Sequence, residues 1–227
     1  MYCAIIADIV NSRALPPGER AQVQLKLTAV LQEINVKYAP GIAAGFLITL
    51  GDEFQGLLSV PSAGIDIVED IRWQMLQNDI ALRFGIGIGE IHTPIDPAQA
   101  LGADGPAYHR AREALNLLKA QSTCTNGALN AYLFTPASDQ MLISALLTNA
   151  REITSQWSDT QLLTLQAWRG AQGRQNQVAA ELGKNPSTIS RQLRSARVWL
   201  YADILNALKG YLQSVYDPRE EAAHVTG

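Results

Sequence analysis

The first 135 residues alternate between apolar and polar blocks, and the spacing within each block predicts its structure. Residues 2–10 (YCAIIADIV) form an apolar run rich in β-branched residues, which is typical of a buried strand. Residues 16–41 predict a long amphipathic helix that ends at Pro40–Gly41. Its apolar residues recur at three- and four-residue spacing: Val23, Leu27, Val30, Leu31 and Ile34.

Residues 44–60 predict two strands, AGFLITL and FQGLLSV, joined by a short hairpin at Gly51–Asp52–Glu53. The following segments predict, in order, a helix at 61–77, a glycine-rich strand at 81–91, a helix at 104–121 and a short strand at 130–135. The order β-α-β-β-α-β, followed by a helix and a strand, is that of a ferredoxin-like or palm-type α+β domain. We therefore expect such a domain over residues 1–135.

The remaining sequence predicts an all-α region. Short polar helices at 136–156 form an expected helical linker, and residues 157–227 an expected helix-turn-helix domain with a C-terminal helix. Three small or apolar residues carry the second prediction: Ala179 would let two helices cross closely, Gly183 would make the turn, and Ile189 would fill the core.

Composition narrows the class of protein. The chain has 227 residues, of which 47% are hydrophobic and 17% charged, as expected for a folded globular protein. No window holds eighteen apolar residues without a charge, and Asp8 interrupts the N-terminal run too early for a signal peptide. Cys3 and Cys124 lack metal-ligand spacing, so neither a zinc site nor a disulfide framework is expected. A cytoplasmic protein without a membrane partner is the simplest interpretation.

Charge is distributed unevenly along the chain. The net charge is −3 overall, but −5 over residues 1–150 and +4 over residues 151–200. A basic block in an acidic protein favours contact between that block and a polyanion. The alternative is a chance cluster of basic residues.

The second helix of the expected helix-turn-helix carries the groups that read DNA. Hydroxyl, amide and guanidinium groups recognise base edges in the major groove, and further cations contact phosphates. The candidate DNA-binding residues are Lys184, Ser187, Thr188, Arg191, Gln192, Arg194 and Ser195. The segment resembles the helix-turn-helix of sigma-factor region 4, which implies double-stranded DNA as a partner. A helical hairpin that only packs or dimerises is the alternative.

Acidic residues lie at the ends of predicted strands. Asp8 comes late in the first strand, and Asp52 and Glu53 occupy the hairpin after the second. If these strand ends meet, the carboxylates repel one another unless a cation such as Mg²⁺ lies between them. Solvated turn residues would explain Asp52 and Glu53 equally well.

The motifs ADIVNS, TLGDEF, RFGIGIGEI and ADGPAYHRAREAL resemble, in this order, motifs of class III nucleotidyl cyclases and of GGDEF-type diguanylate cyclases. The full pattern is most similar to the SatD family. The cyclase resemblance implies that Asp8 and Asp52, with Glu53 as a third acid, bind Mg²⁺. It also assigns the carbonyl of Ile9 to the metal and makes Arg112 and His109 nucleotide contacts.

The same resemblance has four departures. His109 stands where the cyclases carry the asparagine of this helix, and Arg112 is offset by one residue from their arginine. Ile48 stands where the cyclases carry a purine-reading lysine, and Leu50 stands at the first glycine of GGDEF. The sequence thus favours a bacterial DNA-binding transcriptional regulator, a homodimer whose palm domain senses a nucleotide or is a degenerate cyclase. The alternatives are a Mg²⁺-dependent nucleotidyl cyclase or nucleotidyltransferase acting on a nucleoside triphosphate, and a purely structural interaction protein.

Overall fold

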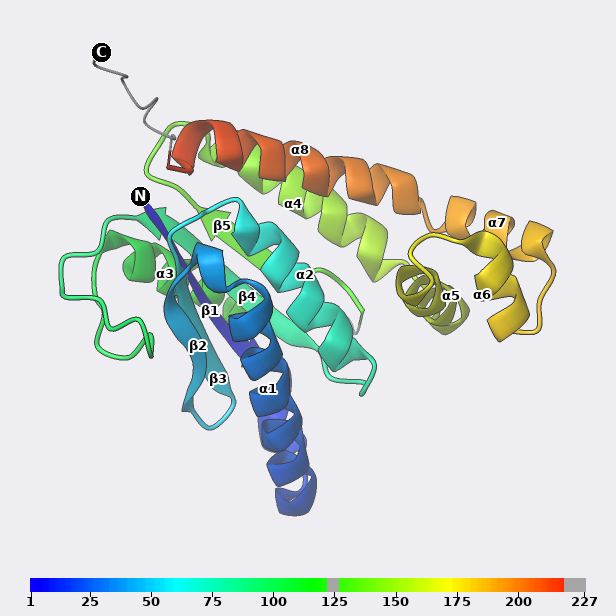
Figure 1. The fold of residues 1–227 in the computed structure, drawn as a ribbon, viewed down its shortest axis with the longest axis horizontal. Coiled ribbons are helices and arrows are strands. Elements are labelled where there is room, and N and C mark those ends of the chain that lie inside the picture. Colours follow the sequence, from blue (N-terminus) through cyan, green and yellow to red (C-terminus); the bar gives the residue numbers. More distant parts are fainter. Residues whose placement is uncertain (122–126, 219–227) are drawn as a thin grey trace, which may run out of the picture.

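A computed structural model describes residues 1–121 and 127–218, which form a mixed α+β structure with one sheet and eight α-helices within these ranges (Figure 1). Cys124 lies outside the described residues. The strands are β1 (Tyr2–Ile9), β2 (Ile42–Leu50), β3 (Glu53–Leu58), β4 (Leu82–Gly89) and β5 (Ala131–Phe134). The α-helices are α1 (Pro17–Lys37), α2 (Ala63–Leu76), α3 (Pro106–Ala120), α4 (Gln140–Ser155), α5 (Asp159–Gly170), α6 (Gln175–Glu181), α7 (Pro186–Ser195) and α8 (Val198–Tyr216). Two short 3₁₀ turns, Ser12–Ala14 and Ala39–Gly41, flank α1.

The five strands lie in the order β2-β3-β1-β4-β5, and the pairs among the first four strands are antiparallel. The first four strands and the helices α1 and α2 follow the predicted β-α-β-β-α-β order. The fifth strand adds parallel to β4 at one edge. In the middle of the sheet, Asp8 of β1 is aligned with Glu53 of β3 on one side and with Arg83 of β4 on the other.

Alternation along β1 divides its side chains between two layers. Cys3, Ile5 and Ala7 face the main core with α1 and α2, whereas Ala4 and Ile6 face a smaller core under α3. Figure 1 shows α1 and α2 together on one side of the sheet. The central strand is therefore covered on both faces, which explains its nearly continuous apolar sequence.

The glycines of β4 set the distance between the sheet and α3. A Cβ atom on Gly87 would lie 2.1 Å from the carbonyl oxygen of Ala107, and one on Gly85 would lie 2.1 Å from that of Ala111. Because these neighbours are backbone atoms of α3, only glycine lets the helix lie this close to the strand.

Residues 136–156 differ from the predicted linker of short helices. They contain one 16-residue helix, α4, whose residues Ile143, Leu147 and Ala150 are buried in the main core. The helix packs against β5 and α8, and α8 also contacts α2. Apolar residues spaced four and three apart were visible in this segment, but their partners are distant in the sequence.

The helices α5, α6 and α7 lie together at one end of the molecule (Figure 1). Val178, Ile189 and Leu193 are buried between them, and Gly183 adopts a φ of +61° in the turn before α7. Within the described part of the chain, no helix is long and apolar enough to cross a membrane.

Candidate functional site

Asp8 and Glu53 do meet at the sheet surface, on the face that α3 covers. They are opposite each other on β1 and β3, and their residues are 3% and 9% exposed. Asp8 is held by Arg83, whose Nε and Nη2 donate to Oδ1 and Oδ2 at 2.8 and 3.2 Å. Such a two-point ion pair is among the strongest hydrogen-bonded contacts available to a carboxylate.

Two cations from α3 complete the cluster. Arg112 donates to both oxygens of Glu53 at 2.6 and 2.7 Å, and these bonds raise the pKa of Arg112 above its usual value. Lys119 Nζ lies 3.0 Å from Asp8 Oδ2 and 3.7 Å from Glu53 Oε2, so it bridges the two acids. The repulsion expected between neighbouring carboxylates is thus relieved by side chains of the protein.

Asp52 lies beside this cluster but has a different partner. Its Oδ2 accepts a hydrogen bond from Ser12 Oγ, and its backbone carbonyl accepts the amide of Ile9 at 3.2 Å. A cavity of about 450 Å³ is lined by Asp8, Asp52, Ser12 and Lys119, together with four other residues of this edge. The described residues contain no group of three histidine, cysteine, aspartate or glutamate side chains arranged to hold a metal ion.

The predicted nucleotide contacts Ile9 and His109 lie in different places. Ile9 lines the cavity beside Asp8, while its side chain belongs to the main core. His109 is exposed at the start of α3, where its Nε2 lies 3.0 Å from Asp104 Oδ1. Arg112 contacts Glu53, so its predicted contact with phosphate stays a prediction.

Three residues of this site were not predicted: Arg83, Lys119 and Ser12. The sequence could have indicated Arg83, because it is the charged residue of an apolar strand and a buried Asp8 needs a partner. It could not have indicated Lys119 or Ser12, because only the packing of α3 on the sheet and the turn after β1 bring them to the acids.

The predicted DNA-binding residues divide into two groups. Ser187, Arg191 and Arg194 are exposed on α7, and Thr188 is half-buried beside them. Arg191 Nη2 lies 3.5 Å from Thr188 Oγ1, one turn earlier on the helix. Lys184 is half-buried in the turn that precedes α7.

Gln192 differs from the expected position on the outer face, whereas Ser195 is exposed and also contacts α5. The half-buried Gln192 accepts a hydrogen bond from Thr164 of α5 at 2.7 Å. Ser195 Oγ accepts one from Gln161 of α5 at 3.0 Å. Both side chains therefore join α7 to α5, and this contact could not be predicted without knowing how the two helices cross.

The fold and its two charged regions define an α+β protein with a helical C-terminal extension. The family model described as "SatD family" matches residues 2–209, and the chain belongs to this family. None of the curated proteins is a significant match.

Three solved structures show distant likeness. The catalytic core of a rhodopsin-guanylyl cyclase with converted specificity, in complex with ATPalphaS, is 16% identical with a TM-score of 0.35, covering 51% of this chain and 71% of that one. A bacterial light-regulated adenylyl cyclase is 17% identical with a TM-score of 0.36, covering 58% and 74%. A regulator of polyketide synthase expression from Bifidobacterium adolescentis is 16% identical with a TM-score of 0.26, covering 96% and 82%. Scores this low carry no functional conclusion.

Proposed function

We propose that this protein is a DNA-binding regulator that reads double-stranded DNA with α7. The proposal is based on the amphipathic character of the α6–turn–α7 segment, which buries its apolar residues and exposes polar and basic ones. Its apolar residues Ile189 and Leu193 are fully buried, while Ser187, Arg191 and Arg194 are exposed. Between residues 170 and 201, five lysines and arginines accompany one acidic residue, Glu181.

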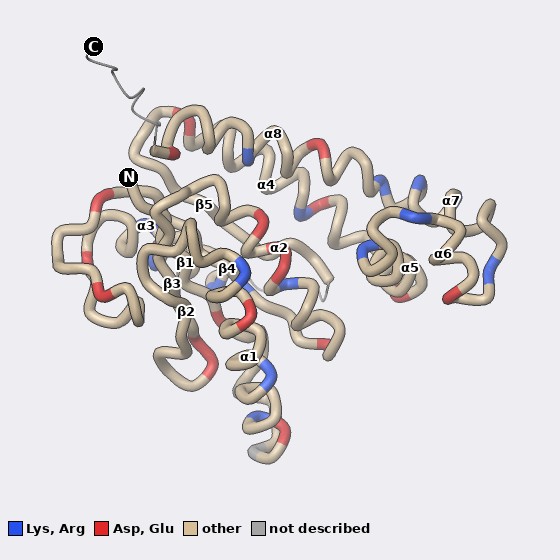
Figure 2. Tube along the Cα trace, viewed as in Figure 1, with Lys and Arg blue, Asp and Glu red and all other residues tan. Residues whose placement is uncertain are grey.

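The distribution of charge supports contact with a polyanion at this end. Figure 2 shows lysine and arginine positions around α6 and α7, whereas acidic positions are concentrated in the sheet region and the loops beside it. A helix that places short hydroxyl and guanidinium side chains on one face suits the major groove, and flanking cations suit phosphates. Arg174 and Arg197, which are both exposed, would add such phosphate contacts.

We propose further that the cyclase-like edge at Asp8 is a degenerate site that does not hold Mg²⁺. The ion pairs support this, because Asp8 and Glu53 are already paired with three cations, Arg83, Arg112 and Lys119. A divalent ion would have to compete with these cations for Asp8 and Glu53, which leaves Asp52 as the only acid of the predicted set without a cation partner among the described residues. Nucleotide binding in the adjoining cavity of about 450 Å³ remains compatible with this proposal.

The DNA proposal is tested by selecting duplexes from a randomised pool with the wild-type protein and measuring their binding by fluorescence anisotropy. Arg191→Ala should weaken binding to a selected duplex about tenfold or more, with a smaller effect on mixed-sequence duplex. Arg194→Ala should weaken both and reduce the slope of log K against log salt by about 0.9, the value of one phosphate contact.

Lys26→Ala is the matched control, since it removes an exposed cation from α1 in the sheet region. It should leave both affinities unchanged. Absence of any enriched sequence, together with no binding at low salt, would overturn the DNA assignment. Equal losses of DNA affinity in Lys26→Ala and Arg191→Ala would show that the protein attracts DNA only by unspecific charge.

The degenerate-site proposal has its own assay. Incubation of the protein with ATP or GTP and Mg²⁺ or Mn²⁺, followed by chromatography, should yield no cyclic nucleotide or dinucleotide. Formation of such a product by the wild-type protein, and its loss in Asp8→Asn, would establish the cyclase alternative instead. The expected homodimer also stays a prediction, which the mass from light scattering checks.

A further inference from the structure

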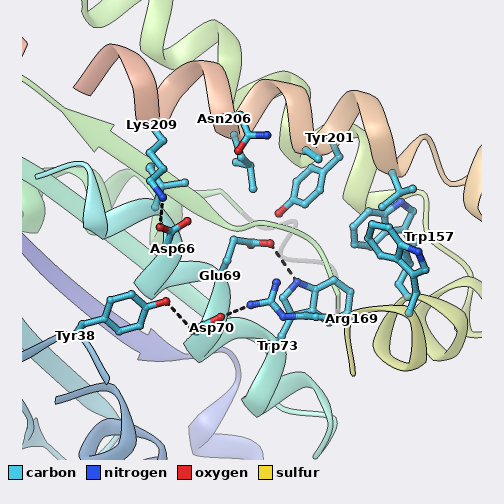
Figure 3. A pocket seen from close by; sticks show the side chains of 16 residues that line it. Tyr38, Asp66, Glu69, Asp70, Trp73, Trp157, Arg169, Tyr201, Asn206 and Lys209 are labelled. Carbon is cyan, nitrogen blue, oxygen red and sulfur yellow. Dashed lines mark hydrogen bonds and ion pairs between the residues drawn. The ribbon is translucent and has the colours of Figure 1, made fainter. Parts of the chain in front are cut away.

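A second cavity lies between the sheet region and the C-terminal helices, well away from Asp8. It has a volume of about 250 Å³ and is enclosed by α2 on one side and by α5 and α8 on the other. Figure 3 shows Trp73, Trp157 and Tyr201 around its inner wall. The rings of Trp73 and Trp157 stack with centroids 5.8 Å apart, and Tyr201 meets Trp157 edge-on at 5.3 Å.

The wall has an apolar part and a charged part. Asp66 and Glu69 of α2 line the same cavity, but they are already paired with Lys209 and Arg72. Leu165 and the half-buried Trp168 come from α5, and Val198 and Leu205 come from α8. Stacked aromatic rings with aliphatic neighbours form a hollow that favours a flat, apolar body. Neither the proposed DNA contacts nor the cluster at Asp8 uses this space.

A second hollow of about 250 Å³ adjoins the first and is polar. The two share Asp70, Trp73 and Arg169, so the Arg169 side chain lies at the boundary between them. Lys37, Gln74, Gln77 and Gln166 line the polar hollow. An aromatic compartment thus opens onto a compartment of amides and cations.

The polar compartment has an excess of hydrogen-bond donors. Asp70 accepts from Lys37, Tyr38 and Arg169, so one carboxylate is shared by two cations. Arg169 is 44% exposed and uses one of its five N–H groups on Asp70, with no other hydrogen-bond acceptor among the described residues. The side-chain amides of Gln74, Gln77 and Gln166 make no hydrogen bond within the part of the chain that the structure describes.

An aromatic compartment beside a compartment rich in hydrogen-bond donors favours one class of ligand. A flat aromatic ring fits the tryptophan-lined compartment, and an anionic group fits beside Arg169 and Lys37, where positive charge and unused donors coincide. An amine would meet the same two cations, while the carboxylates nearby, Asp66, Glu69 and Asp70, are already paired with cations of the protein. We propose that the cavity binds a small aromatic acid, with its carboxylate or phosphate on Arg169.

The test is calorimetric titration of the full chain with three compounds that share one ring system: indole-3-acetate, indole-3-ethanol and tryptamine. Phenyl phosphate is added as a second acid. At least one acid should bind saturably, the neutral alcohol should bind about tenfold more weakly, and the amine should not bind. These measurements contain no DNA, so their outcome is independent of the proposed function.

Arg169→Gln should weaken binding of the acid about tenfold and leave binding of the alcohol unchanged, because only the charge-assisted contact is lost. Arg191→Gln removes an exposed arginine outside the cavity and is the matched control, which should bind the acid as the wild type does. A thermal unfolding curve establishes that Arg169→Gln is folded. Tighter binding of tryptamine than of the acids, an unchanged affinity in Arg169→Gln, or no binding of either acid at millimolar concentration would each overturn the proposal.

Discussion

Arg72 lies at the point where the sheet region and the C-terminal helices share one core. Its side chain is 4% exposed and donates four hydrogen bonds. Two reach the carboxylate of Glu69 on the same helix, at 2.8 and 3.1 Å. The others reach the carbonyl of Gly127 at 2.7 Å and the hydroxyl of Tyr201 on α8 at 3.1 Å. Arg72 therefore joins α2 to the segment before β5 and to α8.

Substitution of Arg72 by methionine should strongly destabilise the protein. The change leaves Glu69 as a buried carboxylate without a cation, although Trp73 Nε1 still donates to it at 3.1 Å. It also leaves the carbonyl of Gly127 and the hydroxyl of Tyr201 without their donor. Loss of one partner of a buried ion pair costs about 3–5 kcal/mol. Since domains are stable by roughly 5–15 kcal/mol, the variant should fold but with much of its stability lost.

The pH dependence gives this prediction a signature. Burial by itself raises the pKa of Glu69, but the charge and hydrogen bonds of Arg72 lower it overall. In the wild type, stability from this pair is present above the ordinary glutamate pKa and is lost as pH falls through the lowered folded-state value. Without Arg72, burial should raise the pKa of Glu69. The stability difference between variant and wild type should then narrow as pH falls from 7 towards 5.

Urea unfolding followed by far-UV circular dichroism measures the difference, because the signal does not depend on the tryptophans that surround Arg72. The double variant Glu69→Gln with Arg72→Met should be more stable than Arg72→Met alone at neutral pH, since no charge is then buried. A loss below about 1 kcal/mol in Arg72→Met, the range of an exposed salt bridge, would refute the reasoning.

Two further stability predictions concern local geometry. Gly87→Ala should lower the melting temperature by about 6–12 °C, because overpacking against the backbone of α3 costs about 3 kcal/mol. Gly210→Ala lies on the exposed face of α8, where a Cβ has open space, and should raise stability by about 0.5–1 kcal/mol. Similar melting temperatures for the two variants would contradict the close approach of α3 to β4. Ser158→Ala removes the capping box with Gln161 at the start of α5 and should lower the free energy of unfolding in urea by about 1 kcal/mol. Ser214→Ala near the end of α8 is the control and should lower it less. Equal losses would show that the cap contributes nothing specific.

The order of strands and helices through residue 135 could be predicted because each element has a recognisable local sequence pattern. The run at residues 2–10, the helical spacing after Pro16 and the turn at Gly51 need no knowledge of distant residues. The order of strands within the sheet, with β1 between β3 and β4, was not predicted. Convergence of Asp8, Asp52 and Glu53 was predicted from their places at strand ends. The structure pairs Asp8 with Glu53, whereas Asp52 lies beside them and contacts Ser12.

The chemical state of that site could not be predicted. Whether two carboxylates bind a metal ion or pair with cations depends on which side chains α3 brings to them. Lys119 lies 111 residues beyond Asp8 in the chain, and nothing in its local sequence marks it as a partner. For the same reason the predicted linker at 136–156 differs from the buried helix α4, whose apolar face is matched by α8 more than fifty residues later.

The contacts at the two ends of α8 show which of the C-terminal helices pack on the sheet region. Tyr211 and Tyr216 both donate to Asp139 at 2.8 Å, and Ser62 donates to Asp217, so the last turns of α8 are fixed to the sheet region. Tyr201 is buried against Arg72 at the other end. Arg197, with a φ of +53°, breaks the chain between α7 and α8. α8 packs on α2 and α4, whereas α5, α6 and α7 pack mainly on one another within the same continuous core. A structural boundary therefore lies at Ala196–Arg197 as well as near Trp157. The proposed DNA-reading unit is therefore a three-helix insertion held at both ends, not a terminal domain on a free linker.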